Sequence, residues 1–497
     1  MFRNVGSTWV LTLLTIVVTY ALTPFVIHTL GAEGYGTWTL ITSMTGYMGL
    51  LSLGIPMASV RYLAQHVAEG DGQKTNQTIA SCAGLYLMIS AAAGVIGAVL
   101  IALFVLAYDI PAALRTEARL AFALMTVQVA AGFIGLLPEG ILLAHHNFVL
   151  RNLVRLGGLV LRLTLTIGLL KLDASLVMLA LVKMTCLAFD FGVSWVLIRR
   201  TYPGIRLSLR DFDWTVVRRI FSFSLFVLLL TAGARLSFET DALVIGAFLG
   251  VGSIAFYAVA NSIVVYLMEF IVAIAAVVAP MATKLHTEGK PTDLREIFLK
   301  WSKVALSLTL MVGLFLVTLG PQFIGWWIGP SFEHPAGQVL QILVLSSFVF
   351  LPVRGVALPI LMGLGKPRLP AVAFLASGVL NLALSILLVG PLGLAGVAIG
   401  TAVPNVLFAM IVLAAACREL KIRVRAYLGY VVPRAALGAL PVLALLLWFR
   451  LGVQVQGVAG LAAAGLAMVL LFAVTWVFFV YRNDPYVDLR GRFRVRA

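Results

Sequence analysis

The sequence predicts an all-α polytopic membrane protein, and three observations support that prediction. Of its 497 residues, 61% are hydrophobic and only 11% are charged. The mean hydropathy of +1.05 lies far outside the range of soluble domains. The apolar residues fall into runs of roughly 20, the length that crosses a bilayer as a helix. No remaining stretch is long enough for a soluble domain, so we expect the whole chain to form one helical bundle.

Fourteen apolar runs define the expected transmembrane helices. The first run is too long for the apolar region of a signal peptide and lacks a small-residue cleavage site, so we expect it to remain as the first helix. The runs lie near residues 6–30, 35–60, 78–107, 120–143, 153–171, 174–198, 220–248, 254–282, 303–328, 338–363, 370–389, 392–416, 431–449 and 456–481.

The basic residues behind the formal net charge of +16 lie mostly in the loops between the expected helices. Basic residues gather in the loops on the side of the N-terminus, so the positive-inside rule explains the charge without nucleic acid as a partner. It predicts that both termini are cytoplasmic. We expect the basic tail to lie on anionic lipid. The inside residues include Arg199, Arg200, Arg206, Arg210, Arg218, Arg219, Lys284, Lys290, Arg295, Lys300, Lys303, Arg418, Lys421, Arg423, Arg425, Arg482 and the arginines after it.

An internal repeat appears when the sequence is shifted by 219 residues. Leu30-Gly31 then meets Leu249-Gly250, and Glu69-Gly70 meets Glu288-Gly289, without a gap. Because six helices return the chain to its starting side, we expect two six-helix lobes related by a parallel pseudo-two-fold axis, with two further C-terminal helices. The expected boundaries are an N-lobe at 1–198, a basic cytoplasmic linker at 199–219, a C-lobe at 220–416, two helices at 417–481 and a basic cytoplasmic tail at 482–497.

The stretch Phe221–Gly250 is apolar and long enough to span a membrane, yet it carries three charges. Each costs roughly 2.5–3.5 kcal/mol at the centre of a bilayer, so a lipid-facing helix would not retain all three. At about 100° per residue, Arg235 and Glu239 share a face, whereas Asp241 points elsewhere. We expect Arg235 and Glu239 to face a cavity, or else to neutralise each other, and Asp241 to fix packing or a gate.

Nine ionisable residues lie within the expected spans. Facing lipid, they would cost on the order of 20–30 kcal/mol together, more than the stability of a typical domain. Most must therefore contact protein or water. They are Glu139, Arg162, Lys183, Asp190, Arg235, Glu239, Asp241, Glu269 and Arg354.

The arginines favour an anionic substrate, because a guanidinium binds phosphate oxygens in a planar fork and stays charged in a low dielectric. Arg235 is the first candidate for substrate binding, followed by Arg162 and Arg354. Arg162 shares a helix face with Arg151 and Arg155. These three either form a ladder that guides an anion, or Arg151 and Arg155 are ordinary interfacial anchors.

Other side chains complete the set of candidates. Tyr47 and Tyr266 are related by the repeat and are further candidates for substrate binding. Glu239 and Glu269 are candidates for ion coupling, with a proton or a sodium ion as the coupling ion. We expect Lys183 and Asp190 to form structural pairs with other helices.

The cysteines and histidines give no sign of a metal or redox site. Cys82, Cys186 and Cys417 are scattered without a CxxC pair, so we interpret them as packing residues. The histidines at 28, 145 and 146 show no ligand spacing. We expect no cofactor, no metal and no catalytic residue.

The segment LGAEGYGTWTLITSMTGYMGLLSLGIPMASVRYLA (30–64) resembles the Wzx-like oligosaccharide flippases of the multidrug/oligosaccharidyl-lipid/polysaccharide exporter superfamily. Further stretches of residues 241–261, 320–332, 361–368 and 390–401 are similar to patterns of that family, and the resemblance covers residues 1–416.

The resemblance implies a two-lobe, alternating-access flippase of a bacterial inner membrane. Its substrate would be a polyprenyl-diphosphate-linked glycan destined for surface polysaccharide or lipopolysaccharide. The first two helices of each lobe would surround a cationic cavity, which points to Arg235 and Glu269. Helices 13 and 14 would help to accommodate the lipid tail. Membrane lipids and polysaccharide polymerase machinery are the further partners to test.

Two alternatives remain. A multidrug exporter of the same superfamily would need an acid-dominated cavity, against which the four intramembrane cations argue. A membrane glycan ligase or polymerase would need a catalytic outer loop, and the longest, near 108–119, shows no convincing acid/base pair. We therefore expect a transporter rather than an enzyme.

Overall fold

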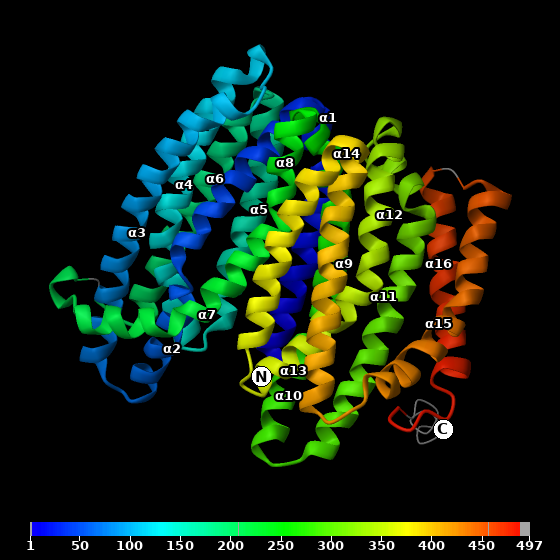
Figure 1. Ribbon diagram of the computed structural model, residues 1–497. Coiled ribbons are helices and arrows are strands. Elements are labelled where there is room, and N and C mark those ends of the chain that lie inside the picture. The colour runs from blue at the N-terminus through cyan, green and yellow to red at the C-terminus, as the bar shows by residue number, and fades with distance from the viewer. Residues whose placement is uncertain (1, 207, 456, 488–497) are drawn as a thin grey trace. The chain divides into compact units, whose positions relative to one another are not determined.

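The computed structural model describes residues 2–206, 208–455 and 457–487, and this part of the chain consists of helices joined by turns and loops, with no strand (Figure 1). The all-α class expected from the sequence is confirmed. The α-helices are α1 (Phe2–Met48), α2 (Ile55–Ala68), α3 (Gly72–Ala107), α4 (Ala112–Ala144), α5 (Phe148–Leu172), α6 (Leu176–Thr201), α7 (Trp214–Phe238), α8 (Thr240–Leu249), α9 (Val251–Val272), α10 (Ala275–Thr287), α11 (Pro291–Trp327), α12 (Pro330–Pro352), α13 (Leu358–Gly363), α14 (Arg368–Glu419), α15 (Val424–Trp448) and α16 (Gly457–Thr475).

Eleven of the described helical segments are long and apolar enough to cross a membrane. Two of them, in α1 and α14, each hold two of the expected spans. The chain turns between those spans at Gly31 (φ 70°) and Gly393 (φ 58°), where a left-handed conformation is open to glycine at little steric cost. The protein is therefore a multi-pass membrane protein, and α7 with α8 accounts for the remaining expected span.

The charged segment Phe221–Gly250 is divided into two helices rather than one. Helix α7 ends at Phe238, a turn falls at Glu239, and α8 begins at Thr240. The side chains of 221–227 and 230 lie outside the described residues. The division separates Arg235 from Asp241 and redirects the chain at the point where its charges gather.

The irregular positions recur 219 residues apart. Gly31 and Gly250 both have positive φ, at 70° and 83°, and Gly70 and Gly289 have 70° and 68°. Helices α3 and α11 begin at Gly72 and Pro291, again with the same offset. The two halves thus share their break points, although the symmetry axis between them stays a prediction.

The described chain divides into two compact units. Unit 1 comprises Met1–Arg235 with Ile245–Ala255, and unit 2 comprises Leu236–Val244 with Phe256–Ala497. The boundaries expected for lobes, linker and tail stay predictions. Unit 1 has a core in which α2, α3 and α4 pack around residues such as Tyr86 and Phe133. Cys82 and Cys417 are buried, Cys186 is half-buried, and all three are free.

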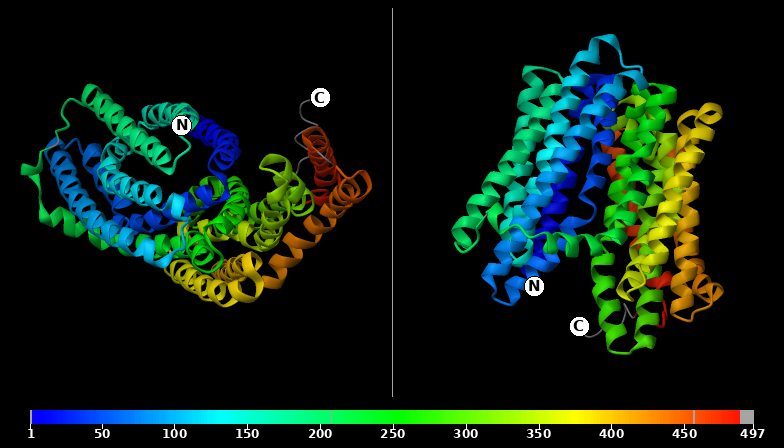
Figure 2. Two further views of the ribbon diagram at one scale, coloured as in Figure 1. Left: turned by 90° about the horizontal axis from the view of Figure 1, so that it is seen from above. Right: turned by 60° about the vertical axis from the view of Figure 1, so that its left-hand side comes forward.

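In unit 2, α15 and α16 lie side by side and pack on α11 around Leu319, Val442 and Phe472 (orange and red in Figure 2). Helix α16 continues into a π-helix, Trp476–Val480, where the chain meets Lys303 of α11. We expected Lys303 in a basic loop on the inner side. Instead it is buried, with 1% exposure, because an acidic partner and two aromatic rings enclose it.

Candidate functional site

Arg162 and Lys183 are neighbouring cations in unit 1. Arg162 lies mid-way along α5 and Lys183 in the second turn of α6, and the two helices pack together. The positive charges are near enough to repel each other. Among the described residues neither side chain has an ion pair or a hydrogen bond. An anion placed beside them would relieve this repulsion.

This arrangement corrects the expectation that Lys183 makes a structural pair with another helix. The acidic residue of the same helix, Asp190, interacts instead with the charges of Arg155 and Glu139. It packs so closely on α5 that a Cβ at Gly158 would lie 2.6 Å from its Oδ1. Lys183 was therefore missed as a site candidate, and the signal that could have found it was its lack of an acid within one turn on its own helix.

Tyr47 and Arg235 are brought together within unit 1. The Tyr47 hydroxyl donates a hydrogen bond of 3.2 Å to the backbone carbonyl of Arg235. A Cβ at Gly49 would lie 3.4 Å from Nη2 of Arg235, so the glycine leaves room for the guanidinium. Two candidates from distant parts of the sequence thus share one place, at the end of α1 and the last turn of α7.

Arg354 occupies an aromatic cage in unit 2. It lies on a π-helical turn, Val353–Ala357, where α12 loses its regular hydrogen bonds after a proline. Its guanidinium carbon lies 5.8, 5.7 and 5.3 Å from the ring centres of Phe238, Phe350 and Phe374. Its Nε is buried and finds no hydrogen-bond acceptor in the described part of the chain. The rings hold the cation without neutralising it.

Asp241 of α8 is buried in unit 2 inside a cluster of oxygen atoms. The Tyr257 hydroxyl donates to its Oδ2 at 2.6 Å, and the Thr401 hydroxyl lies 3.1 and 3.0 Å from its two oxygens. Asn381 Nδ2 donates in turn to Thr401 Oγ1 at 2.9 Å. Asp241 is 2% exposed and no cation pairs with it among the described side chains.

Further oxygens lie along the same face of α14. Ser377 Oγ, Asn381 Oδ1 and Ser385 Oγ are buried without a hydrogen-bond partner in the described chain, and their spacing of four residues places them in one row. A buried carboxylate beside unsatisfied oxygens lacks positive charge, so a proton or a small cation would suit this cluster. Sequence reasoning assigned Asp241 to packing or a gate, because helical periodicity does not reveal Thr401 or Asn381.

Glycines allow the two arms of α14 to meet at this cluster. A Cβ at Gly396 would lie 2.1 Å from the backbone oxygen of Leu388, and one at Gly400 would lie 2.4 Å from Ser385 Oγ. Small residues four apart permit helices to approach closely. This close packing positions Thr401, the residue after Gly400, against Asn381 and Asp241.

The other predicted residues remain candidates. Glu239 forms the turn between α7 and α8. In α9, Glu269 is exposed and Tyr266 is half-buried, one turn apart near the end of the helix. No group of three or more His, Cys, Asp or Glu side chains that could hold a metal ion occurs among the residues searched.

Residues 1–286 match the model of the family described as polysaccharide biosynthesis protein. The chain belongs to this family. Two of its relatives are similar at 21% identity. One is the uncharacterized membrane protein EpsK of Bacillus subtilis, over 413 residues, 80% of this chain and 78% of that protein. The other is a Shigella flexneri protein named "Putative O-antigen transporter", over 401 residues, 78% of this chain and 90% of that protein.

Solved structures share the fold of this chain. The lipid II flippase MurJ in an inward closed conformation superposes with a TM-score of 0.72 at 13% identity, covering 96% of this chain and 98% of that one. An inward-facing MATE multidrug resistance transporter of the MOP superfamily gives a TM-score of 0.71 at 16% identity, covering 81% and 94%. The transporter fold of this superfamily, expected from the sequence, is thereby confirmed.

Proposed function

We propose that this protein is an alternating-access flippase of a bacterial inner membrane. Its cargo is a polyprenyl-diphosphate-linked oligosaccharide for cell-surface polysaccharide, and both termini lie in the cytoplasm. The observation that carries the proposal is the pair of cations Arg162 and Lys183, which have no acidic partner among the described residues. A diphosphate supplies the negative charge that two neighbouring cations lack.

Further support comes from the other arginines and from the relatives. Arg354 is a third cation without an acidic partner in the described chain, and Arg235 lies with Tyr47. In our proposal these residues bind the cargo, and Tyr266 contributes to the same task. The names of two similar proteins, an O-antigen transporter and a lipid II flippase, agree with this chemistry.

We assign ion coupling to the Asp241 cluster together with the predicted Glu239 and Glu269. Loading Asp241 with a proton or a sodium ion changes the charge of a buried group, and that change can bias one conformation over the other. The dense oxygen environment of Asp241 makes it the first of the three to test.

Transport is tested with purified protein in proteoliposomes that contain a fluorescent polyprenyl-diphosphate glycan. With wild-type protein, labelled lipid that starts in either leaflet should become accessible to a membrane-impermeant quencher added outside the vesicles. The double variant Arg162→Gln, Lys183→Gln should lose this movement at unchanged thermal stability. Equal movement of a neutral polyprenyl glycan, or an unaffected double variant, contradicts the proposal. Transport of organic cations instead would favour a multidrug exporter, and glycan chain growth would favour a ligase or polymerase.

A further inference from the structure

Glu139 bridges two arginines in unit 1, where the end of α4 meets the start of α5. Arg151 donates from Nε at 2.9 Å and from Nη2 at 2.6 Å, and Arg155 donates from Nη2 at 2.6 Å. All three hydrogen bonds end on one atom, Oε1 of Glu139. The second carboxylate oxygen accepts none among the described residues.

The N–H donors of the two arginines outnumber the lone pairs of the Glu139 oxygen that accepts from them. A carboxylate oxygen has two lone pairs, yet Oε1 receives three N–H groups, and the two guanidiniums still have further donors. A phosphate group carries more oxygens at the same spacing and matches paired guanidiniums better. Glu139 thus occupies a place where a phosphate would make more of the available hydrogen bonds.

A ligand can reach this cluster from the surface of the protein. The side chains of Arg155, Glu139 and Arg151 are 46%, 31% and 18% exposed. Pro138 precedes Glu139 inside α4 and removes one backbone hydrogen bond of that helix. The last turns of α4, which carry Glu139, can therefore move with less resistance than a regular helix.

The surrounding charges favour an anion once Glu139 leaves. Asp190 on α6 contributes a negative charge near Arg155. Arg162 and Lys183 contribute two positive charges deeper in the same pair of helices. The six side chains together hold four cations and two carboxylates. Release of one carboxylate leaves a strongly positive track along α5 and α6.

We infer that Arg151 and Arg155 form a phosphate site for a diphosphate lipid headgroup, and that Glu139 is an internal counter-ion which the headgroup displaces. The inference rests on the proposed function, since it places a first binding site for the same headgroup ahead of Arg162 and Lys183. Of the two interpretations of Arg151 and Arg155, it favours residues that guide an anion over ordinary interfacial anchors.

The test measures lipid binding to the full-length protein in mild detergent by native mass spectrometry. The probes are a polyprenyl diphosphate, phosphatidylglycerol and a neutral polyprenol. Glu139→Gln removes the competing charge and should tighten diphosphate binding about tenfold, the effect of one charge-assisted contact. Arg151→Lys combined with Arg155→Lys keeps the charges but loses the planar forks, and should weaken it by a similar factor.

Glu419→Gln serves as the matched control. It breaks the Lys366–Glu419 ion pair of unit 2, whose partners are 55% and 31% exposed, and should leave all affinities unchanged. If Glu139→Gln tightens the binding of the polyprenyl diphosphate alone, the site belongs to the cargo. Equal tightening for phosphatidylglycerol supports the phosphate site but assigns it to membrane lipid.

Unchanged or weaker diphosphate binding by a stably folded Glu139→Gln variant overturns the inference, as does undiminished binding by the double lysine variant. Failure of this site is distinguishable from failure of the proposed function. Wild-type protein that flips the labelled glycan while Glu139→Gln binds like wild type refutes the site alone. Phosphate binding that tightens in Glu139→Gln, without any flipping by wild type, refutes the function alone.

Discussion

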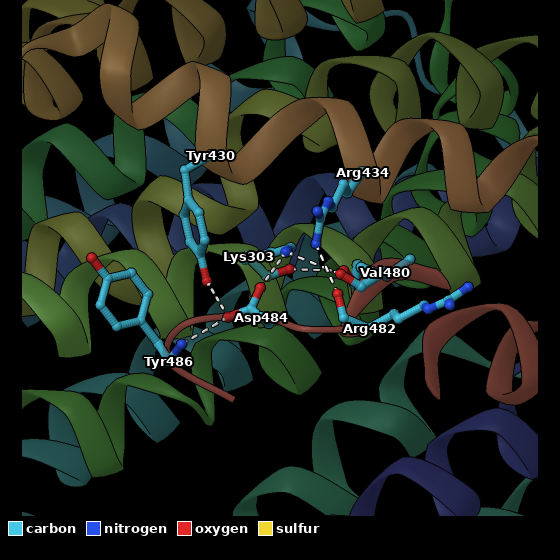
Figure 3. A network of polar contacts seen from close by, with 8 residues as sticks. Lys303, Tyr430, Arg434, Val480, Arg482, Asp484 and Tyr486 are labelled. Carbon is cyan, nitrogen blue, oxygen red and sulfur yellow. Dashed lines mark hydrogen bonds and ion pairs between the residues drawn. The ribbon is translucent and has the colours of Figure 1, made fainter. Parts of the chain in front are cut away.

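Lys303 Nζ lies 2.5 Å from Asp484 Oδ2 in the network of polar contacts drawn in Figure 3. The two side chains are 1% and 0% exposed. Lys303 also donates to the backbone carbonyl of Val480 at 3.1 Å, and the Tyr430 hydroxyl donates to Asp484 Oδ1 at 2.8 Å. The pair joins α11 to the chain that follows α16. A buried ion pair in which both partners make further hydrogen bonds holds helices α15 and α16 in place.

Removal of the lysine charge should destabilise unit 2 strongly. Lys303→Met leaves Asp484 buried without its cation, which costs about 3–5 kcal/mol for such pairs. Thermal unfolding in detergent checks this. Lys366→Met, which breaks an exposed pair, should cost at most about 1 kcal/mol. Equal melting temperatures of the two variants would contradict a structural role for the buried pair.

Stability should also depend on Asp484 at acidic pH. Burial opposes ionisation of Asp484, but the hydrogen bonds from Lys303 and Tyr430 prevail and hold its pKa below the ordinary 3.8. The stabilisation is therefore complete above the unfolded pKa and is lost as the pH falls through the lower folded pKa. Melting curves from pH 6 down to pH 3 should show this loss in the wild type. Asp484→Asn should remove that component, and an identical acid response of both proteins would refute it.

Arg235 should be required for transport rather than for folding. Arg235→Ala removes a guanidinium from the proposed cargo site, so flipping should fall to background while expression and membrane insertion persist. The Tyr47 hydroxyl donates to the backbone carbonyl of Arg235, so this hydrogen bond does not depend on the Arg235 side chain. The measurement is the flipping of the labelled glycan in proteoliposomes, with insertion verified by protease protection. Full activity of the variant would show that Arg235 does not bind the cargo.

Asp241 should govern the ion dependence of transport. Asp241→Asn keeps the size of the side chain and its capacity to accept from Tyr257 and Thr401, but loses the charge. We expect transport to lose its response to a sodium or proton gradient. The matched variant Glu269→Gln tests an exposed acid of the same unit. An unaltered gradient response in Asp241→Asn, with a loss in Glu269→Gln, would transfer the coupling role to Glu269.

Close packing within α14 should not tolerate a larger residue at Gly396. Its Cβ would lie 2.1 Å from the Leu388 carbonyl oxygen, a backbone atom that cannot turn aside. Gly396→Ala should cost at least about 1–3 kcal/mol by overpacking, measured by thermal unfolding. Gly390→Ala meets open space in the same helix, and should be neutral or stabilising by about 0.4–1 kcal/mol. A harmless Gly396→Ala would show that the two arms of α14 can separate.

Much of the fold could be predicted from the chain itself. Hydropathy predicts the membrane-spanning helices because each needs about 20 apolar residues whatever its neighbours are. The 219-residue repeat, which is visible in the sequence, pairs Gly31 with Gly250, and both have positive φ. The family patterns, too, are local glycine and aromatic motifs. These properties depend on residues close together in the sequence.

Partners of the charged side chains could not be predicted in the same way. Helical periodicity tells that Asp241 lies off the face of Arg235, but not that it meets Thr401, 160 residues later. Likewise, a count of basic residues places Lys303 in an inner loop, whereas Asp484 draws it into the core of unit 2. Which helices pack together depends on long-range contacts.

The sequence by itself thus determined the class of protein, the approximate positions of most of its membrane-spanning helices, and the abundance of cations that suits an anionic cargo. Only the tertiary structure decided which of those cations are neutralised. Glu139 pairs with both Arg151 and Arg155, while Arg162 and Lys183 lie near each other without an acid among the described residues. The reason is physical: hydropathy is a property of one segment, but compensation of a buried charge is a property of two side chains that packing brings together.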